Sequence, residues 1–328
     1  MAIQDSRLQY YLLSFLSILA IRYASTTSYF AASVQAMPDV LSQSTPDVCQ
    51  SVDQPNPIAA TYPNNATGTL NGTIAILPIP LDLARSLIPS QYRILEHAYR
   101  SLLPSFPVGM YPALLQALHD HDVQAFGIHI PDFSRASIEF PFVDLLGDNS
   151  TSFKWNPTQF LSRGHELAIQ GAQAYGIDVF EATFDPPCDA YRAAAPAAHA
   201  HAHDQQTTTT FVATSAHACL ETVFKTSTST STTSTSHDEI PLAFFKNVTN
   251  QVIFADAKTC DNMIRLYDTA VSLSPHTIQR VTGSVKAHVP PFDAEQTWEH
   301  VSGLRFDSAF IENNYLPCEN FRGYPPPS

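Results

Sequence analysis

The spacing of hydrophobic residues predicts a chain built mainly from strands. Residues 72–80 (GTIAILPIP) are rich in Ile and Leu and end in two prolines, which is typical of a strand that stops there. Residues 240–256 predict a pair of strands around the turn-prone Asn250, and residues 303–318 predict a last strand and a tail. The hydrophobic residues of 111–123 follow neither a helical period nor a strand period consistently, so this stretch is compatible with either a helix or a strand.

Residues 134–148 (SRASIEFPFVDLLGD) give the clearest strand pattern. Ile138, Phe140 and Phe142 fall on one side of the predicted strand and Glu139 on the other, because successive side chains of a strand point to opposite faces. The pattern therefore places a carboxylate within an apolar strand.

Three stretches predict short helices. In residues 81–89 the leucines and isoleucine share one helical face and Pro89 ends the helix. Residues 165–176 carry a stripe of small residues and a final glycine, which is typical of a helix and its stop. Residues 261–271 predict a third helix with Asp261 at its N-cap.

Two segments contain too few apolar residues for burial of their side chains to offset the conformational entropy that ordering would cost. Residues 193–210 are rich in Ala, His and Thr, and residues 225–238 are almost entirely Ser and Thr, which indicates solvated loop insertions and, in the second, O-linked sugar. The predicted organisation is a signal peptide over 1–36, an irregular segment over 37–71, a β-barrel domain over 72–318 with these two insertions, and a tail over 319–328.

The first residues predict entry into the secretory pathway. Residues 10–21 (YYLLSFLSILAI) form an apolar run too short to span a bilayer comfortably, and small residues that end near Ala36 follow, as in a cleaved signal peptide. The alternatives are an uncleaved membrane anchor and a buried N-terminal helix. Four Asn-x-Ser/Thr sequons favour secretion and predict glycosylation, with no stable membrane span after cleavage; they are Asn65, Asn71, Asn149 and Asn247.

Composition and charge argue against some classes of binding partner. The 328 residues carry a formal net charge of −13 and no long basic run, which argues against nucleic acid and anionic membranes as partners. The five cysteines lack C-x-x-C spacing, so zinc is not indicated, and two disulfides with one free thiol are expected in an oxidising compartment. The cysteines are Cys49, Cys188, Cys219, Cys260 and Cys318. Their pairing stays open, although a Cys49–Cys318 bridge would tie down both ends of the domain.

Three motifs carry a resemblance to a known family. Residues 76–94 (ILPIPLDLARSLIPSQYRI), 137–142 (SIEFPF) and 165–176 (HELAIQGAQAYG) are similar to the opening strand and helix, the Tyr-x-Glu strand and a later helix of the acetoacetate decarboxylase family. The likeness covers about residues 72–190, with weaker similarity to 310. It implies a fold that is mainly β with a few short helices (α+β), an acetoacetate-decarboxylase-like β-barrel.

The resemblance also implies a chemistry that this chain matches only in part. In the family, a lysine whose pKa is lowered by a neighbouring lysine forms a Schiff base with a β-keto acid, and a glutamate and an arginine orient the carboxylate. The lysine pair falls within residues 171–182 (GAQAYGIDVFEA), which contain no lysine. The arginine position falls near Thr69, and the next arginine in that region is Arg85. Glu139 matches the family glutamate, with Ser137 in place of the tyrosine.

A lysine elsewhere in the chain is a candidate for the missing amine. If Asn247 carries sugar and lies on a strand, its neighbour Lys246 points inward with Phe244 and Val248, where burial depresses the pKa of an amine. The alternative is a surface lysine that keeps its ammonium in water. The chain has five lysines in all: Lys154, Lys225, Lys246, Lys258 and Lys286.

Glu139 is the second candidate catalytic residue. Inside a barrel it would act as a general acid or base or orient a substrate carbonyl. The structural alternative is a carboxylate paired with Arg135 or with backbone donors on the outer face of the sheet.

The histidines give weaker signals. Residues 199–204 (HAHAHD) have metal-ligand spacing but lie in a low-complexity stretch, residues 118–122 (LHDHD) offer His119 and Asp122 to a metal or proton relay, and His129 fits a hydrogen-bonded strand residue. No glycine-rich phosphate loop and no G-x-S-x-G motif is present in the sequence. We therefore expect no metal and no cofactor.

Three functions fit these observations. The first is a secreted decarboxylase, a carbon–carbon lyase that converts a β-keto acid or polyketide-derived acid to a ketone and carbon dioxide, since the wider group resembles decarboxylases of fungal polyketide toxin pathways in secondary metabolism. The second is a secreted, non-catalytic β-barrel that binds an apolar small molecule. The third is a glycosylated surface protein with a structural role only. The sequence does not indicate an oligomeric state.

Overall fold

The fold is taken from a computed structural model of the chain. It describes residues 51, 53–125, 127–193, 207–226, 240–273 and 277–326. All of these residues fall in one compact unit. The predicted signal peptide lies outside the described residues, as do the histidines of residues 199–204.

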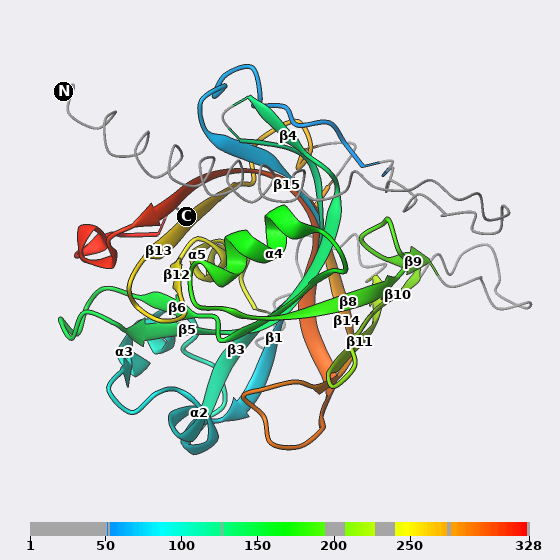
Figure 1. Cartoon of the computed structure of the whole chain (residues 1–328). Helices are drawn as coiled ribbons and strands as arrows, with labels where there is room; N and C mark the ends of the chain where they lie inside the picture. The colour runs from blue at the N-terminus through cyan, green and yellow to red at the C-terminus, as the bar shows by residue number, and fades with distance from the viewer. Residues whose placement is uncertain are drawn as a thin grey trace, which may run out of the picture. The chain divides into compact units, whose positions relative to one another are not determined.

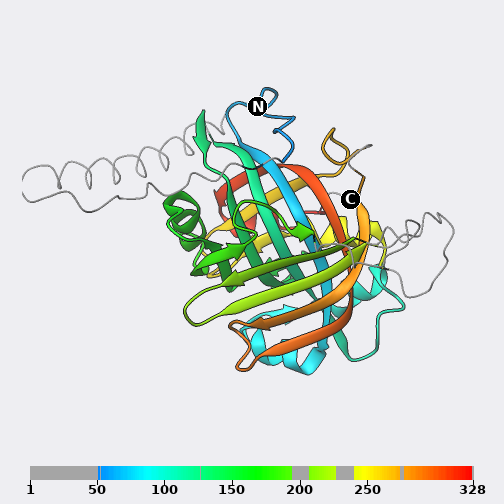
Figure 2. The same ribbon diagram turned by 90° about the vertical axis from the view of Figure 1, so that its right-hand side faces the viewer.

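A ring of strands forms the body of this unit (Figure 1, Figure 2). Its hydrogen-bonded order is β5-β7-β8-β10-β11-β14-β15-β1-β3, and β3 pairs with β5 to close it. The pairs are antiparallel except β7–β8, which is parallel. The bounds are β1 Ala66–Pro80, β3 Met110–Ala125, β5 Phe133–Asp144, β7 Thr158–Ser162, β8 Asp178–Asp185, β10 Thr208–Thr214, β11 Cys219–Thr226, β14 Gln279–His288 and β15 Gln296–Leu316.

A smaller ring shares four of these strands. From β5 the pairing runs through β6 Phe153–Trp155, β12 Val252–Phe254 and β13 Cys260–Leu266 to β15, and then back through β1 and β3. The strands β15, β1, β3 and β5 therefore form a wall common to both rings, which we call the shared wall. Three short strands, β2 Arg93–Ile94, β4 Ile128–Ile130 and β9 Arg192–Ala193, pair with β5, β3 and β10.

The pattern of buried residues along each strand follows from the arrangement of the two rings. Residues 111–120 of β3 and most of β1 and β5 are buried on both faces, because each face of the shared wall lines a ring. By contrast, β10 and β11 line only the larger ring, and their burial alternates residue by residue. The prediction of a mainly β barrel with a few short helices is confirmed, and residues 111–123 are resolved as strand.

The helices are short and lie between strands. They are α2 Leu81–Leu87, α3 Glu96–Leu102, α4 Glu166–Gln173 and α5 Leu242–Thr249, with a 3-10 turn, η1, at Cys318–Phe321. The helices predicted at 81–89 and 165–176 are confirmed as α2 and α4. Gly176 follows α4 with a φ of 83°, a value that favours glycine, which fits its predicted role as a stop.

Two predicted elements are wrong. The strand predicted at the start of 240–256 is the helix α5, since its buried residues Phe244, Phe245, Val248 and Thr249 have helical spacing. The helix predicted at 261–271 is strand β13, because Asp261 is paired with β12 and the following residues with β15. Asp261 is therefore not a helix cap.

Several boundaries also shift. β1 begins at Ala66 rather than at residue 72, and β15 begins at Gln296 rather than at 303. The end of the predicted insertion 193–210 belongs to β10, and the start of 225–238 belongs to β11. Within the described residues, no helix is long and apolar enough to cross a bilayer.

Within the described residues, Cys260 and Cys318 form a disulfide, Cys188 is also disulfide-bonded, and Cys219 has a free thiol. The bridge considered between Cys49 and Cys318 is therefore not formed. The observed bond fixes the start of β13 to η1, directly beyond the end of β15.

Candidate active site inside the smaller ring

The interior of the smaller ring holds a buried lysine paired with a buried glutamate. The Lys154 Nζ lies 2.9 Å from the Glu139 Oε2, and the two side chains are only 1% and 3% exposed. Lys154 projects from β6 and Glu139 from β5, while the Lys154 ammonium also donates to the Thr249 carbonyl at the end of α5, at 3.2 Å. The Ser137 hydroxyl donates to the Glu139 Oε1 at 3.2 Å.

An arginine with free donors faces the same interior. Arg265 on β13 is buried, and its Nη2 donates to the Gln116 Oε1. The Arg265 Nε and Nη1 have no hydrogen-bond partner in the described part of the chain, and no carboxylate there lies within ion-pair distance of this guanidinium. Its central carbon lies 5.8 Å from the centroid of the Phe306 ring. A buried cation without an anionic partner is costly, so this arrangement favours an anionic ligand.

Burial and the neighbouring Arg265 guanidinium both lower the pKa of Lys154. Burial lowers the pKa of Lys154 below its ordinary value of 10.5, the Glu139 carboxylate opposes that shift, and the Arg265 guanidinium adds to it. A buried amine beside a second cation loses its proton more easily, because both desolvation and like charge disfavour the ammonium. The Arg265 guanidinium is therefore a neighbouring cation that favours loss of the Lys154 proton.

Acidic side chains complete the polar interior. Asp120 on β3 is paired with Arg135 on β5, with 3.0 Å between Oδ2 and Nε, yet burial outweighs this cation and raises the pKa of Asp120 to about 7. Burial also raises the pKa of Asp261 well above its usual range, and the nearby Glu312 carboxylate adds to the shift. The interior thus contains both a lysine with a lowered pKa and carboxyl groups with raised pKa values.

The sequence left Glu139 either inside the barrel or on the outer face of the sheet, and it did not identify the partner of this carboxylate. Glu139 lies on the inner face rather than the outer face, and Arg135 pairs with Asp120 instead of with Glu139. Lys154 is one of the five lysines of the chain, and the strand patterns in the sequence do not single it out. The signal was its place in the segment Phe153-Lys154-Trp155, in which both neighbours are large and buried.

Lys246 does not occupy the position inferred for it. It lies on α5, so the strand alternation that was to turn it inward does not apply. The side chain is half-buried, with its Nζ 5.9 Å from the centroid of the Tyr267 ring. The Glu139 carboxylate pairs with Lys154 and not with Lys246.

The segment where the family carries its lysines supplies no amine here. Residues 171–182 form the end of α4, a turn and the start of β8, with Ile177 buried and Asp178 exposed. Arg85 is exposed and paired with Asp82 and Glu96, away from the ring interior. The groups that could perform this chemistry come instead from β5, β6 and β13.

The candidate histidines lie elsewhere. His119 faces the larger ring, with 3.0 Å between its Nδ1 and the Ser134 Oγ. Asp122 lies on β3 with a φ of 45°, and its carboxylate accepts from the Asn56 backbone N–H, while His129 is exposed on β4. Among the described residues no group of three or more His, Cys, Asp or Glu side chains has a metal-binding arrangement.

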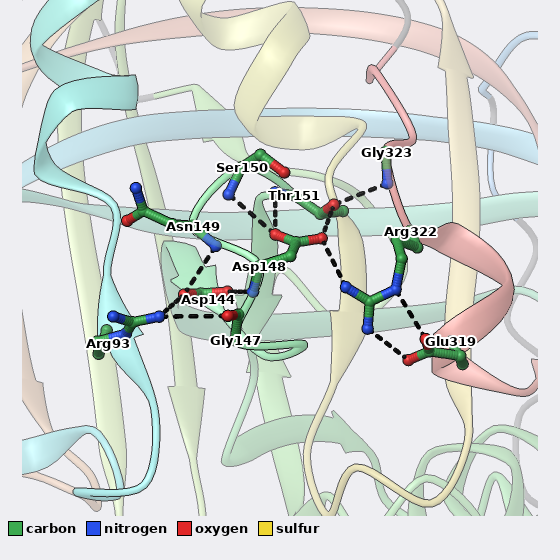
Figure 3. A network of polar contacts seen from close by, with 10 residues as sticks. All are labelled: Arg93, Asp144, Gly147, Asp148, Asn149, Ser150, Thr151, Glu319, Arg322 and Gly323. Atoms are coloured by element: carbon green, nitrogen blue, oxygen red, sulfur yellow. Dashed lines mark hydrogen bonds and ion pairs between the residues drawn. The ribbon is translucent and has the colours of Figure 1, made fainter.

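The predicted glycosylation sites have different environments. Asn149 is exposed in a turn held by Asp144 and Asp148, and the Arg322 side chain ties this turn to η1 (Figure 3). The Asn149 side chain points away from this network. Asn71 instead donates from its amide to the Asp53 Oδ1 at 2.6 Å. Asn65 and Asn247 are half-buried. Sugar attachment stays a prediction, and the geometry favours Asn149 over Asn71.

Comparison with known proteins gives weak structural similarity only. No protein-family model matches the chain, and no curated protein matches its sequence. Similar solved structures include the enduracididine biosynthesis enzyme MppR complexed with pyruvate, at 10% identity and a TM-score of 0.42, covering 76% of this chain and 88% of that one. MppR with HEPES buffer bound is 11% identical with a TM-score of 0.40, and the match covers 76% of this chain and 85% of that one. The MppR complex with the condensation product of pyruvate and imidazole 4-carboxaldehyde is 11% identical with a TM-score of 0.42, and the match covers 81% of this chain and 96% of that one. At these values, the chemistry has to be argued from the residues of this chain.

The raised pKa of Asp120 predicts a pH-dependent stability. In the unfolded chain this carboxyl loses its proton near 3.8, whereas in the folded protein it keeps the proton up to about 7. Between these values the folded state binds more protons, so the free energy of unfolding is expected to fall as the pH rises from about 4 to about 7. Guanidinium denaturation at several pH values measures the slope. Asp120→Asn is expected to flatten it, and an unchanged slope in that variant would contradict the assignment.

Proposed function

We propose that this protein is a lysine-dependent decarboxylase of β-keto acids, with Lys154 as the amine that forms the imine. The observation that carries the proposal is the buried contact of 2.9 Å between the Lys154 Nζ and the Glu139 Oε2. The same ring holds the Arg265 guanidinium, whose Nε and Nη1 have no hydrogen-bond partner in the described part of the chain. A nucleophilic lysine, a proton carrier and a carboxylate-binding cation are the three groups that such a reaction requires. Lys154 replaces Lys246 as the candidate amine.

The reaction balances with these groups. The Lys154 ammonium passes two protons through Glu139 to the ketone oxygen, which leaves as water while the nitrogen forms a double bond to the carbonyl carbon; the product is an iminium. The bond to the carboxylate then breaks, carbon dioxide leaves, and its electron pair moves into the iminium to give an enamine. A proton from water adds to the enamine carbon, and hydrolysis releases the ketone and restores the ammonium.

Arg265 supplies the carboxylate-binding position. A guanidinium with two free nitrogens matches a carboxylate in a bidentate pair, and burial strengthens that pairing. The ion pair between Arg265 and the substrate carboxylate weakens during the reaction, because the carboxylate loses its charge as it becomes carbon dioxide. Substrates without a carboxylate are therefore expected to bind poorly.

Entry of substrate requires an opening of the smaller ring. Lys154 is 1% exposed, and one of its two contacts is the carbonyl of Thr249, the last residue of α5. A displacement of α5 would both expose the amine and remove an acceptor that holds its ammonium form. We therefore place the entry at this helix.

The experiment is borohydride trapping with acetoacetate and longer β-keto acids, followed by peptide mass spectrometry and a parallel measurement of carbon dioxide release. Turnover with an adduct on the peptide that contains Lys154 is the expected result. Turnover that borohydride does not inhibit, or an adduct on another lysine, would overturn the assignment of Lys154. Absence of turnover and adduct across the series would overturn the proposal of a decarboxylase.

The alternative of a barrel that binds an apolar small molecule receives less support. On the face of the shared wall opposite Glu139, ring contacts run from Tyr111 to Phe140, from Phe140 to Phe292 and from Phe292 to Trp298, with centroids 5.7–6.3 Å apart. These side chains of the protein pack together where an apolar ligand would bind. Saturable binding of an apolar ligand without turnover would favour this alternative.

A further inference from the structure

A row of polar side chains crosses the shared wall on the face opposite the lysine. Asp307 on β15 is directly opposite Asn71 on β1, Asn71 is directly opposite His119 on β3, and His119 is directly opposite Ser134 on β5. Directly opposite residues of adjacent strands point to the same face. The row therefore lines the larger ring and is separate from the site around Lys154.

A residue from the chain preceding β1 joins this row. Asp53 accepts a hydrogen bond from the Asn71 amide at its Oδ1, at 2.6 Å. Its charge also raises the pKa of Asp307, which burial has already raised and which reaches about 7. The Asp53 carboxylate is thus near enough to act on the charge of Asp307, although the two residues are far apart in the sequence.

Three acceptor atoms in this cluster lack partners. The Asp53 Oδ2, the Asp307 Oδ1 and the His119 Nε2 are buried and make no hydrogen bond within the described part of the chain. His119 is fully buried, and its Nδ1 contacts the Ser134 Oγ at 3.0 Å. Burial lowers the pKa of His119, while the Asp53 carboxylate, the largest opposing influence, raises it. A neutral His119 that donates from Nδ1 to Ser134 presents Nε2 as an acceptor.

We propose that Asp53, Asp307 and His119 form a binding site for a primary ammonium group. Such a group has three N–H donors and no acceptor, which matches three buried acceptors without another partner among the described residues. Its positive charge is attracted to both carboxylates and balances one of their two negative charges. Asp53 and Asp307 are each only half-buried as whole residues, so parts of both remain in contact with solvent beside the three buried acceptor atoms.

A metal ion fits this cluster less well. The described residues contain no group of three or more His, Cys, Asp or Glu side chains in a metal-binding arrangement, and a metal would need ligand atoms at about 2.0–2.6 Å. Hydrogen bonds to an ammonium span about 2.7–3.2 Å and therefore suit a wider cluster. A primary ammonium group donates N–H hydrogen bonds and a metal ion does not, so probes that differ in their number of N–H donors distinguish the two kinds of ligand.

The test is isothermal titration of the full chain with n-butylammonium chloride at pH 8, above the pKa of Asp307. The matched probe is n-butyltrimethylammonium chloride, which has the same chain and charge but no N–H donor, and calcium chloride is the third. We expect saturable binding of n-butylammonium alone, weakened at least tenfold in Asp307→Asn and unchanged in Asp178→Asn, an exposed residue of β8.

Asp53→Asn gives a second variant if Asp307→Asn fails to fold, because Asp53 precedes the first strand. Equal binding of both ammonium probes, binding of calcium alone, no saturable binding, or full binding by both folded variants would each overturn the proposal. None of these outcomes depends on turnover of a keto acid, so the two sites are tested separately.

Discussion

Replacing Lys154 by methionine is expected to abolish imine trapping and decarboxylation and to lower the free energy of unfolding by roughly 3–5 kcal/mol. The stability loss follows because the variant leaves the Glu139 carboxylate, 3% exposed, without the cation 2.9 Å away. An uncompensated buried charge costs more than the pair itself contributes. Urea denaturation followed by circular dichroism gives the stability, and the trapping experiment gives the chemistry.

Two further variants separate chemistry from folding. Lys154→Met combined with Glu139→Gln removes both charges and is expected to recover most of the lost stability while activity stays absent. Lys246→Met is the matched control, because this lysine is half-buried with its Nζ 5.9 Å from the Tyr267 ring centroid. It is expected to keep activity and to change stability by less than about 1 kcal/mol. Activity retained in Lys154→Met, or lost in Lys246→Met, would contradict the assigned amine.

The double role of the shared wall explains which strands could be predicted. The alternation around Glu139 predicted a strand correctly, because a polar residue there faces the smaller ring while Phe140 faces the larger one. Residues 111–123 remained ambiguous since both of their faces are buried, and a strand buried on both sides loses the period of two. Whether such a stretch is strand or helix is decided by its neighbours, here β1 and β5.

The buried partner of Glu139 could not be predicted for a related reason. Lys154 lies in a three-residue strand, too short to show a period, and its contact with Thr249 joins residues 95 positions apart in the chain. Arg265 was assigned to a helix, which removed it from consideration as a ring residue. Local patterns identified the glutamate, whereas the lysine and arginine depend on pairings between distant segments that only the closed smaller ring brings together.

Replacing Gly283 by alanine is expected to destabilise the larger ring by about 3 kcal/mol or more. Gly283 lies on β14 opposite Phe224 of β11, where an added Cβ would overlap the Val223 carbonyl oxygen and come within 2.8 Å of the Phe224 Cα. Both contacts involve backbone, so relief requires β11 and β14 to separate and to weaken their hydrogen bonds. Thermal unfolding of the variant measures the effect as a lowered Tm.

Gly171→Ala is the matched control for this substitution. Gly171 lies within α4, and an added Cβ there would meet only the Tyr315 hydroxyl, at 4.0 Å. Alanine favours a helix over glycine by about 0.8–1 kcal/mol, so this variant is expected to be as stable as the wild type or slightly more stable. The opposite order of the two variants would mean that β11 and β14 do not approach each other at Gly283, and the larger ring would then not close through this pair.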